Sequence, residues 1–173
     1  MSRVLEPFFQ EPARRHYLLD LSRTIKLAHT SVKKNLIKLV KEGLIQETME
    51  KRGSRKFPVY TANTNNPEFK KYKAIYNLQR IQESGLIECL EEKLTPKSIV
   101  LFGSYQRGED LGDSDIDLYL ECKEERIGLK EYEKKLKRKI QLHFKEDFTK
   151  YPSELKNNII NGIVLKGFLE GYK

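Results

Sequence analysis

Two carboxylates and a Gly-Ser pair stand at a spacing that suits the binding of a metal-bound phosphate. Gly103 and Ser104 directly follow an apolar run at residues 99–102, and ten residues later Asp115 and Asp117 open a second apolar stretch. In an extended strand, residues two apart share a face, so the two carboxylates are expected to project together. Adjacent carboxylates repel each other, and a bound cation relieves that repulsion. Oxygen ligands favour Mg²⁺, which completes its coordination with water and substrate phosphate.

The residues after the first apolar run have the chemistry of a phosphate-binding turn. Gly103 permits a tight turn and a close approach of its backbone to a ligand. Ser104 offers a hydroxyl and an N–H group, and Arg107 adds a charged donor. Together with the paired carboxylates, these residues predict a site for a nucleoside triphosphate and Mg²⁺.

These motifs resemble those of the DNA polymerase β-like nucleotidyltransferase superfamily, and in particular its small minimal nucleotidyltransferases. The resemblance extends over about residues 99–168. It implies nucleotidyl transfer, in which bound metal polarises the α-phosphate, a hydroxyl attacks and pyrophosphate leaves. It also implies that Asp115 and Asp117 are catalytic metal ligands. By the same resemblance, the nucleotide is bound by Gly103, Ser104 and Arg107.

The family pattern adds a third carboxylate on a later strand, which we expect here at residues 139–144. Gln141 occupies the matching position and, as a neutral amide, is a poor metal ligand. His143 shares its face, but imidazole is a soft substitute for a Mg²⁺ ligand. The intervening loop offers three other carboxylates: Glu109, Asp110 and Asp113. The sequence thus indicates nucleotide binding more firmly than it indicates catalysis.

The positive charge is concentrated in the N-terminal part of the chain. The net charge of the 173 residues is +8, and residues 1–67 hold 13 Lys and Arg against 6 Asp and Glu. Residues 68–173 hold 20 against 19 and are almost neutral. This asymmetry predicts a polyanionic partner for the N-terminal part.

Other features of the composition favour a cytoplasmic protein. No apolar stretch has the length needed to span a membrane, and we expect no secretory leader. Cys89 and Cys122 are the only cysteines, without the spacing of a zinc site, and we expect both to be reduced.

Residues 16–62 follow the order of a helix-turn-helix and a β-hairpin. Apolar residues recur at helical spacing in residues 16–28 and again from Val32 to Val40, and Gly43 suits the end of the second helix. Two strands are expected at residues 44–50 and 57–62. This order resembles a winged helix-turn-helix domain.

Two sets of polar residues in this module suit contact with DNA. One face of the second helix carries Ser31, Lys34, Asn35 and Lys38. The turn between the strands carries Arg52, Arg55 and Lys56 next to Lys51, like the basic tip of a wing. Winged helices also serve as dimerisation or protein-docking units, and this alternative stays open.

The sequence therefore predicts an α+β protein with three parts. A winged helix-turn-helix domain at residues 1–66 is joined by a helical connector at residues 67–97 to a small, mixed nucleotidyltransferase-like domain at residues 98–173. The long amphipathic connector favours a homodimer.

Three functions fit this organisation. The first is a DNA-binding transcriptional regulator whose C-terminal domain binds Mg²⁺-nucleotide. The second is an active, Mg²⁺-dependent nucleotidyltransferase that moves AMP or another NMP onto a hydroxyl of a small molecule or protein, such as a toxin-like partner. The third is a scaffold with neither activity.

Overall fold

A computed structural model describes residues 2–170 of the chain. The chain divides into two compact units, Met1–Lys73 and Ala74–Lys173. The division falls within the long helix α4 (Pro67–Ser84), in the part of the sequence expected to be a helical connector. Among the described residues, no helix has both the length and the apolar character needed to cross a membrane.

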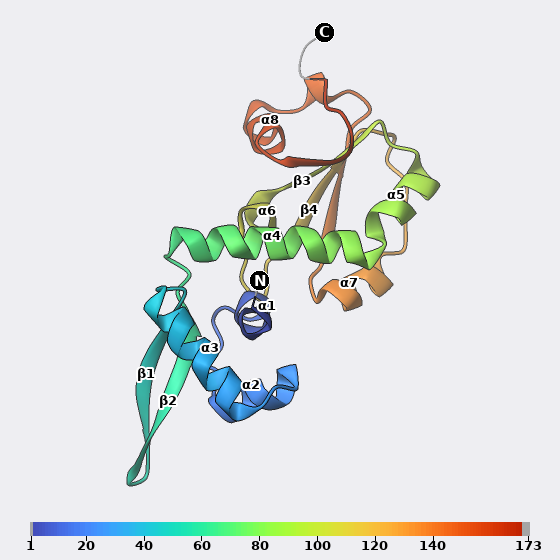
Figure 1. Cartoon of the computed structure of the whole chain (residues 1–173). Helices are drawn as coiled ribbons and strands as arrows, with labels where there is room; N and C mark the ends of the chain where they lie inside the picture. Colours follow the sequence, from blue (N-terminus) through green and yellow to red (C-terminus); the bar gives the residue numbers. More distant parts are fainter. Residues whose placement is uncertain (1, 171–173) are drawn as a thin grey trace. The chain divides into compact units, whose positions relative to one another are not determined.

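The first unit is made of short helices and one long hairpin (Figure 1). Its elements are η1 (Arg3–Leu5), α1 (Glu6–Gln10), α2 (Leu18–Ile25), α3 (His29–Lys41), β1 (Ile45–Arg52) and β2 (Arg55–Ala62). The antiparallel register of β1 and β2 runs from Ile45↔Ala62 to Arg52↔Arg55, so the strands continue further into the basic turn than the sequence predicts. The tip of the hairpin extends beyond α2 and α3 of the same unit.

Apolar periodicity and one glycine fix the course of α3. Val32, Leu36 and Leu39 recur at helical spacing and are buried. Gly43 follows with φ +72°, a left-handed conformation that glycine adopts without a steric penalty. Its carbonyl accepts hydrogen bonds from the side-chain amide of Asn63 at 2.8 Å, and the chain then enters β1.

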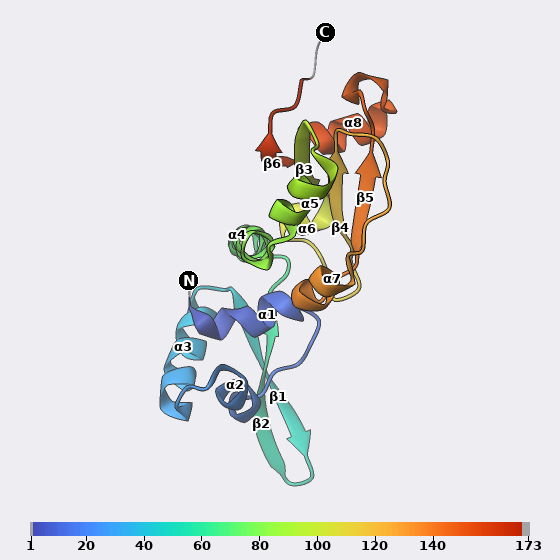
Figure 2. The ribbon, with the colours of Figure 1, turned by 90° about the vertical axis from the view of Figure 1, so that its right-hand side faces the viewer.

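The second unit is a four-stranded sheet with helices on both faces. Its strands are β3 (Ser98–Phe102), β4 (Ile116–Leu120), β5 (Ile140–Phe144) and β6 (Ile163–Gly167). They lie side by side in the order β5-β4-β3-β6 (Figure 2), with β4 and β5 parallel and the other pairs antiparallel. Its other helices are α5 (Leu86–Leu94), α6 (Gly103–Arg107), α7 (Lys130–Leu136), η2 (Phe148–Lys150) and α8 (Ser153–Ile160).

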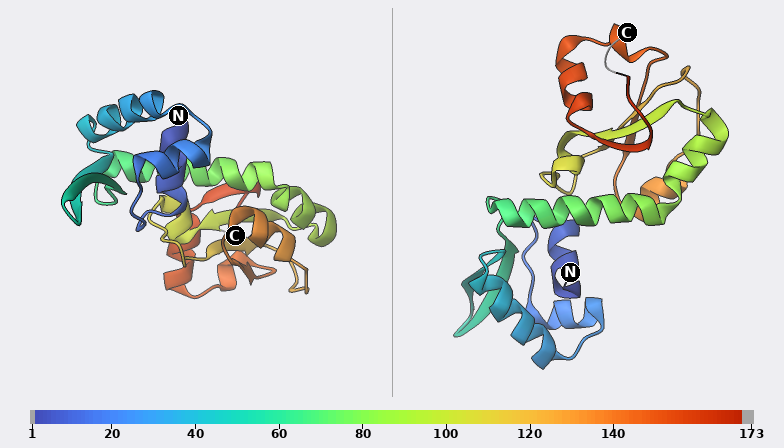
Figure 3. Two further views of the ribbon diagram at one scale, coloured as in Figure 1. Left: turned by 90° about the horizontal axis from the view of Figure 1, so that it is seen from below. Right: turned by 45° about the horizontal axis from the view of Figure 1, so that its top comes forward.

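Strand alternation gives the sheet two buried faces. One face packs against α5 and α7 in a core that includes Leu90, Leu118 and Leu136. The other face packs against η2 and α8, where Tyr119 contacts Phe148 and Ile159. The right-hand view of Figure 3 shows α8 beside this part of the sheet. Asp117 belongs to the second face because it lies two residues before Tyr119 on β4.

The predicted α+β architecture is confirmed. The mixed sheet and its helices occur in the predicted order, and most bounds differ by one or two residues. Two features differ from the prediction. The segment after Gly103 forms the short helix α6 where the sequence suggested a loop, and residues 3–10 form η1 and α1, which were not predicted.

Candidate active site

Gly103 and Asp117 lie in direct contact in the candidate site. Phe102 and Asp117 are register partners on β3 and β4, so Gly103 begins α6 directly beside the Asp117 side chain. Gly103 has φ +80°, and a Cβ atom added to it would lie 2.5 Å from Asp117 Oδ2. Both the backbone conformation and the space therefore require glycine at this position.

The neighbouring strand β5 places two polar side chains on the face of Asp117. Gln141 is the register partner of Asp117 in the parallel β4–β5 pair. His143 Nε2 lies 3.1 Å from Asp117 Oδ1, and its ring packs against Phe102 with the ring centroids 5.1 Å apart. One carboxylate oxygen thus faces the Gly103 turn while the other contacts the imidazole.

The carboxylates present fit a magnesium ion that arrives with a substrate. Asp115 and Asp117 are both half-buried and are two residues apart where the chain enters β4. Within the described part of the chain, no cluster of three or more Asp, Glu, His or Cys side chains is arranged to hold a metal ion. Mg²⁺ commonly uses one or two carboxylates and takes its other ligands from water and phosphate, which is compatible with this pair.

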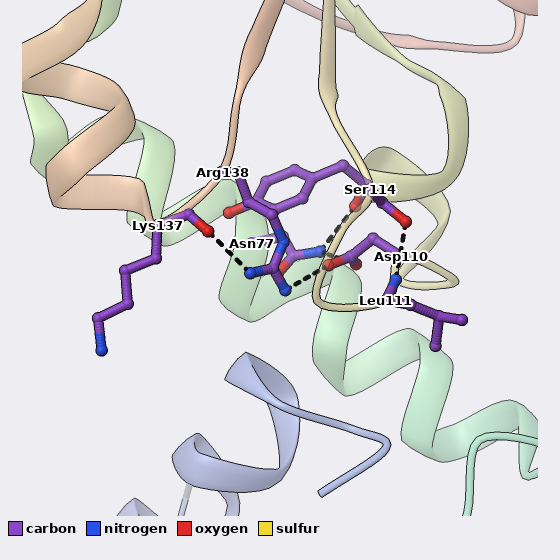
Figure 4. Close-up of polar contacts among 7 residues, drawn as sticks. Asn77, Asp110, Leu111, Ser114, Lys137 and Arg138 are labelled. Carbon is purple, nitrogen blue, oxygen red and sulfur yellow. Dashed lines mark hydrogen bonds and ion pairs between the residues drawn. The ribbon is translucent and has the colours of Figure 1, made fainter.

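A buried polar network anchors the loop between Ser104 and Asp115 (Figure 4). The Asp110 side chain is fully buried and pairs with Arg138, whose Nη2 lies 3.3 Å from Asp110 Oδ2. Asn77 donates from Nδ2 to Asp110 Oδ1 at 2.7 Å and to the Tyr105 carbonyl at 2.8 Å. The network therefore connects α4 and α6 with the loop that contains Asp110 and with the segment that leads into β5.

This network excludes one of the three loop carboxylates that the sequence offered as a third metal ligand. Asp110 cannot serve as a third metal ligand because both of its oxygens face Asn77 and Arg138. Glu109 Oε2 is engaged by Arg107 Nε at 2.9 Å. Asp113 is exposed and lines a cavity together with Asp115.

The comparisons with known proteins concern this same region. Residues 83–165 match the family model described as "Nucleotidyltransferase domain", a range that contains β3, β4, β5, Gly103 and Asp117. Over this range the second unit is therefore similar to a nucleotidyltransferase domain. No curated protein matches the chain significantly.

A solved structure that is similar to part of the chain is titled "Possible transcriptional regulator from Methanosarcina mazei Go1". Its sequence identity is 19%, and the alignment covers 54% of this chain and 79% of that one, with a TM-score of 0.37.

Ser104 and Arg107 lie near the two ends of the short helix α6. Both belong to α6, which begins at Gly103 and ends at Arg107. The Arg107 side chain is half-exposed and contacts Glu109 rather than the carboxylates of the site. To reach a nucleotide, Arg107 would have to exchange Glu109 for phosphate.

In the first unit, Ser31, Lys34 and Lys38 on the predicted polar face of α3 are exposed, and Asn35 is half-buried. Asn35 is the residue nearest the buried stripe: its Nδ2 donates to the Ser31 carbonyl at 2.9 Å, and its Oδ1 accepts from Ser2 Oγ at 3.2 Å. Two further lysines of the same helix, Lys33 and Lys41, are also exposed.

The hairpin tip brings like charges together. The register places Lys51 opposite Lys56 and Arg52 opposite Arg55, and all four side chains are exposed. Directly opposed like charges destabilise a strand pair.

Arg52 is held differently from its neighbours at the tip. Its Nε lies 2.8 Å from Glu50 Oε1, its Nη2 donates to the Tyr17 hydroxyl, and its guanidinium lies 4.5 Å from the Tyr17 ring centroid. The hydrogen bonds from Tyr17 and Arg52 lower the pKa of Glu50. Arg52 is therefore part of the hairpin's support, whereas Arg55 and Lys56 face solvent.

Proposed function

We propose that the nucleotidyltransferase domain binds a nucleoside triphosphate with Mg²⁺ and transfers its nucleotidyl group to a hydroxyl. The juxtaposition of Gly103 with Asp117 carries this proposal. It brings a turn without a side chain directly against a carboxylate, so a phosphate bound by the turn and a metal ion bound by Asp117 would be neighbours. The family match over residues 83–165 supports this reaction class.

Each residue of the site has a distinct task in this proposal. Asp115 and Asp117 would hold the metal ion, and a bound ion would supply positive charge next to the phosphates. Gly103 lets the backbone approach the phosphates, and Ser104 donates to them from its hydroxyl and N–H group. His143 positions Asp117 through its contact at 3.1 Å. Catalysis is then mainly a matter of positioning and charge stabilisation.

The neutral side chain of Gln141 is expected to make the transfer reaction slow. It lies beside Asp117 in the register, where a carboxylate would add negative charge for a second metal ion. An amide is a weaker ligand, so we expect tight nucleotide binding combined with slow transfer. Slow transfer is compatible with a nucleotide that acts mainly as an effector.

The direct test is incubation of the full chain with each of four α-labelled nucleotides, ATP, CTP, GTP and UTP, in the presence of Mg²⁺. Label should move to the protein itself or to a component of a cell lysate, and added EDTA should prevent it. An absence of transfer from all four nucleotides would reduce the function to binding. An absence of Mg²⁺-dependent binding would overturn the proposal.

A second function, DNA binding by the first unit, is favoured by the basic hairpin tip. The opposed pairs Lys51↔Lys56 and Arg52↔Arg55, together with the lysines of α3, give this unit a positive surface. A winged-helix domain would use such a surface for phosphate contacts. We infer that the chain binds double-stranded DNA through this unit, as a transcriptional regulator would.

This inference is tested by measuring DNA affinity against salt concentration. Replacing Arg55 and Lys56 with Ala should weaken binding to all sequences and reduce the salt dependence by about two charges. Lys93→Ala with Lys97→Ala is the matched control, because it removes two exposed positive charges from the second unit. Wild-type protein without salt-dependent DNA affinity would contradict this function.

Three other sequence predictions stay predictions: a homodimer, a toxin-like protein partner and a cytoplasmic location. Light scattering of the purified chain tests the first of them.

A further inference from the structure

His143 contacts the oxygen of Asp117 that does not face the glycine turn. Its Nε2 lies 3.1 Å from Asp117 Oδ1, whereas a Cβ atom on Gly103 would lie against Oδ2. The sequence holds three histidines, and His143 is the one in the second unit. The proposed nucleotide site therefore has an imidazole nitrogen directly beside a carboxylate that we assign to the metal ion.

The fold holds the imidazole ring in this place. His143 lies on β5 opposite Tyr119 and two residues after Gln141, the register partner of Asp117. Its ring packs against the buried side chain of Phe102, with the ring centroids 5.1 Å apart. The side chains of His143 and Asp117 are 19% and 25% exposed, so both keep some access to solvent. An ion from solvent can therefore reach a nitrogen whose ring is held by packing.

The distance between the two groups suits a shared metal ion. In octahedral coordination with metal–ligand distances of about 2.1 Å, two adjacent ligands lie about 3.0 Å apart. The 3.1 Å between Nε2 of His143 and Oδ1 of Asp117 matches that spacing. The protein needs to supply few ligands, because nucleotide phosphates and water complete the coordination. A hydrogen bond has a similar length, and the two roles of His143 differ in the metal that they favour.

The chemistry of imidazole selects the metal. Mg²⁺ prefers oxygen ligands and gives up its water reluctantly, so it gains little from a neutral nitrogen. Divalent transition-metal ions accept imidazole, and their affinity for such ligands increases from Mn²⁺ through Fe²⁺ to Co²⁺. Gln141, beside Asp117 in the register, adds no charge that would favour Mg²⁺ instead.

We propose that Asp117 and His143 together ligate a divalent transition-metal ion, so that the nucleotide site binds Mn²⁺ or Co²⁺ more tightly than Mg²⁺. The proposal rests on the proposed nucleotide site and specifies the class of metal ion that this site takes. With Mg²⁺, the carboxylates hold the ion and His143 only positions Asp117. With a transition-metal ion, the lone pair of Nε2 adds a ligand and raises the affinity.

Calorimetry on the full chain measures this preference without turnover. A non-hydrolysable α,β-methylene ATP analogue is titrated in the presence of Mg²⁺, Mn²⁺ or Co²⁺ into wild type and into His143→Gln. The amide of Gln can donate a hydrogen bond to Asp117 but is a poor metal ligand. The analogue itself binds each metal equally in both titrations, so the difference between the two proteins reports the protein ligand.

The expected losses differ from one metal to the next. His143→Gln should weaken binding with Co²⁺ at least about tenfold, with Mn²⁺ less, and with Mg²⁺ hardly at all. A residue that only positions Asp117 would give the same loss with all three metals, or no loss where Gln replaces the hydrogen bond.

Pulsed electron paramagnetic resonance of bound Mn²⁺ identifies the ligand itself. In protein labelled uniformly with ¹⁵N, coupling to a protein nitrogen is detected separately from the ¹⁴N of the nucleotide. Wild type should show ¹⁵N coupling and His143→Gln should lose it. His29→Gln is the matched control, because His29 is an exposed histidine of the first unit, and it should retain the coupling.

The outcomes distinguish failure of this proposal from failure of the proposed function. An equal change with all three metals in His143→Gln, or wild type without ¹⁵N coupling, would overturn ligation by His143. If His143→Gln does not fold, wild type labelled with ¹⁵N in histidine alone decides the question, because coupling then requires an imidazole ligand. Failure of wild type to bind the analogue with any of the metals would instead overturn the proposed function.

Discussion

A Cβ atom on residue 103 would lie 2.5 Å from Asp117 Oδ2, so the glycine and the carboxylate occupy one shared space. Real Cβ atoms do not approach a side-chain oxygen so closely, and the Asp117 side chain is already held on its other oxygen by His143. A side chain at residue 103 therefore displaces the carboxylate that we assign to the metal ion. The spacing between the Gly-Ser pair and Asp-x-Asp in the sequence brings Gly103 next to Asp117 in the folded chain.

Gly103→Ala should abolish or strongly weaken Mg²⁺-ATP binding. The added methyl group both pushes Asp117 aside and narrows the turn, and we expect a loss of at least about tenfold in affinity. Gly85→Ala is the matched control, because Gly85 has a similar φ of +77° but no atom within 4 Å of an added Cβ. Both variants should lose about 1–2 kcal/mol of stability from the left-handed backbone. Equal nucleotide affinity in both would contradict the role of Gly103.

Gln141→Asp should increase the rate of nucleotidyl transfer. The new carboxylate would lie beside Asp117 in the register and would strengthen metal binding during the reaction. A gain of about tenfold requires only about 1.4 kcal/mol of additional transition-state stabilisation. Gln141→Asn has nearly the same size without the charge and should not increase the rate. Release of pyrophosphate over time measures the effect, and a lower rate in the Asp variant would exclude a metal-binding role for this position.

Asp110→Ala should destabilise the second unit severely. It leaves the Arg138 guanidinium, whose side chain is 7% exposed, without its carboxylate and removes an acceptor from Asn77. Breaking a buried ion pair by removing one partner typically costs about 3–5 kcal/mol. Asp113→Ala, on the exposed part of the same loop, is the control and should stay within about 0.5 kcal/mol of wild type. Urea unfolding of the full chain decides between these outcomes.

The stability of the first unit should fall in mild acid because of His16. Burial lowers the pKa of His16 below its usual value of 6.5, and its Nε2 has no hydrogen-bond partner among the residues that the structure describes. As the pH falls below 6.5, the unfolded chain binds the proton first, so the free energy of unfolding decreases until the lowered pKa is reached. His16→Phe keeps an aromatic ring against Phe8, whose ring centroid lies 4.5 Å away, and removes the proton. This variant should show a smaller loss of stability between pH 7 and pH 5, and an unchanged pH profile would contradict the assignment.

Much of the second unit was predictable because the signals in its sequence are local. The buried strand β3 is an unbroken apolar run, and strand alternation already placed Gln141 and His143 on one face. The opening helices at residues 3–10 escaped prediction because segments of three and five residues are too short to show helical periodicity.

The contacts that hold the sites in place were not predictable from sequence patterns. Asn77 and Asp110 are 33 residues apart, and Tyr17 and Arg52 are 35 apart, so only the folded chain brings them together. In each pair, one residue had been predicted from the sequence to contact a ligand: Asp110 a metal ion and Arg52 DNA. Asp110 belongs to a buried anchor and Arg52 to the support of the hairpin.

We propose above all that Asp115 and Asp117 bind a nucleotide through Mg²⁺. Isothermal calorimetry with ATP, in the presence and absence of Mg²⁺, tests it most directly on wild type and on the Asp115→Asn, Asp117→Asn double variant. We predict Mg²⁺-dependent binding by wild type and its loss in the double variant, with the thermal unfolding transition retained. Nucleotide affinity that is the same in both proteins would contradict the account.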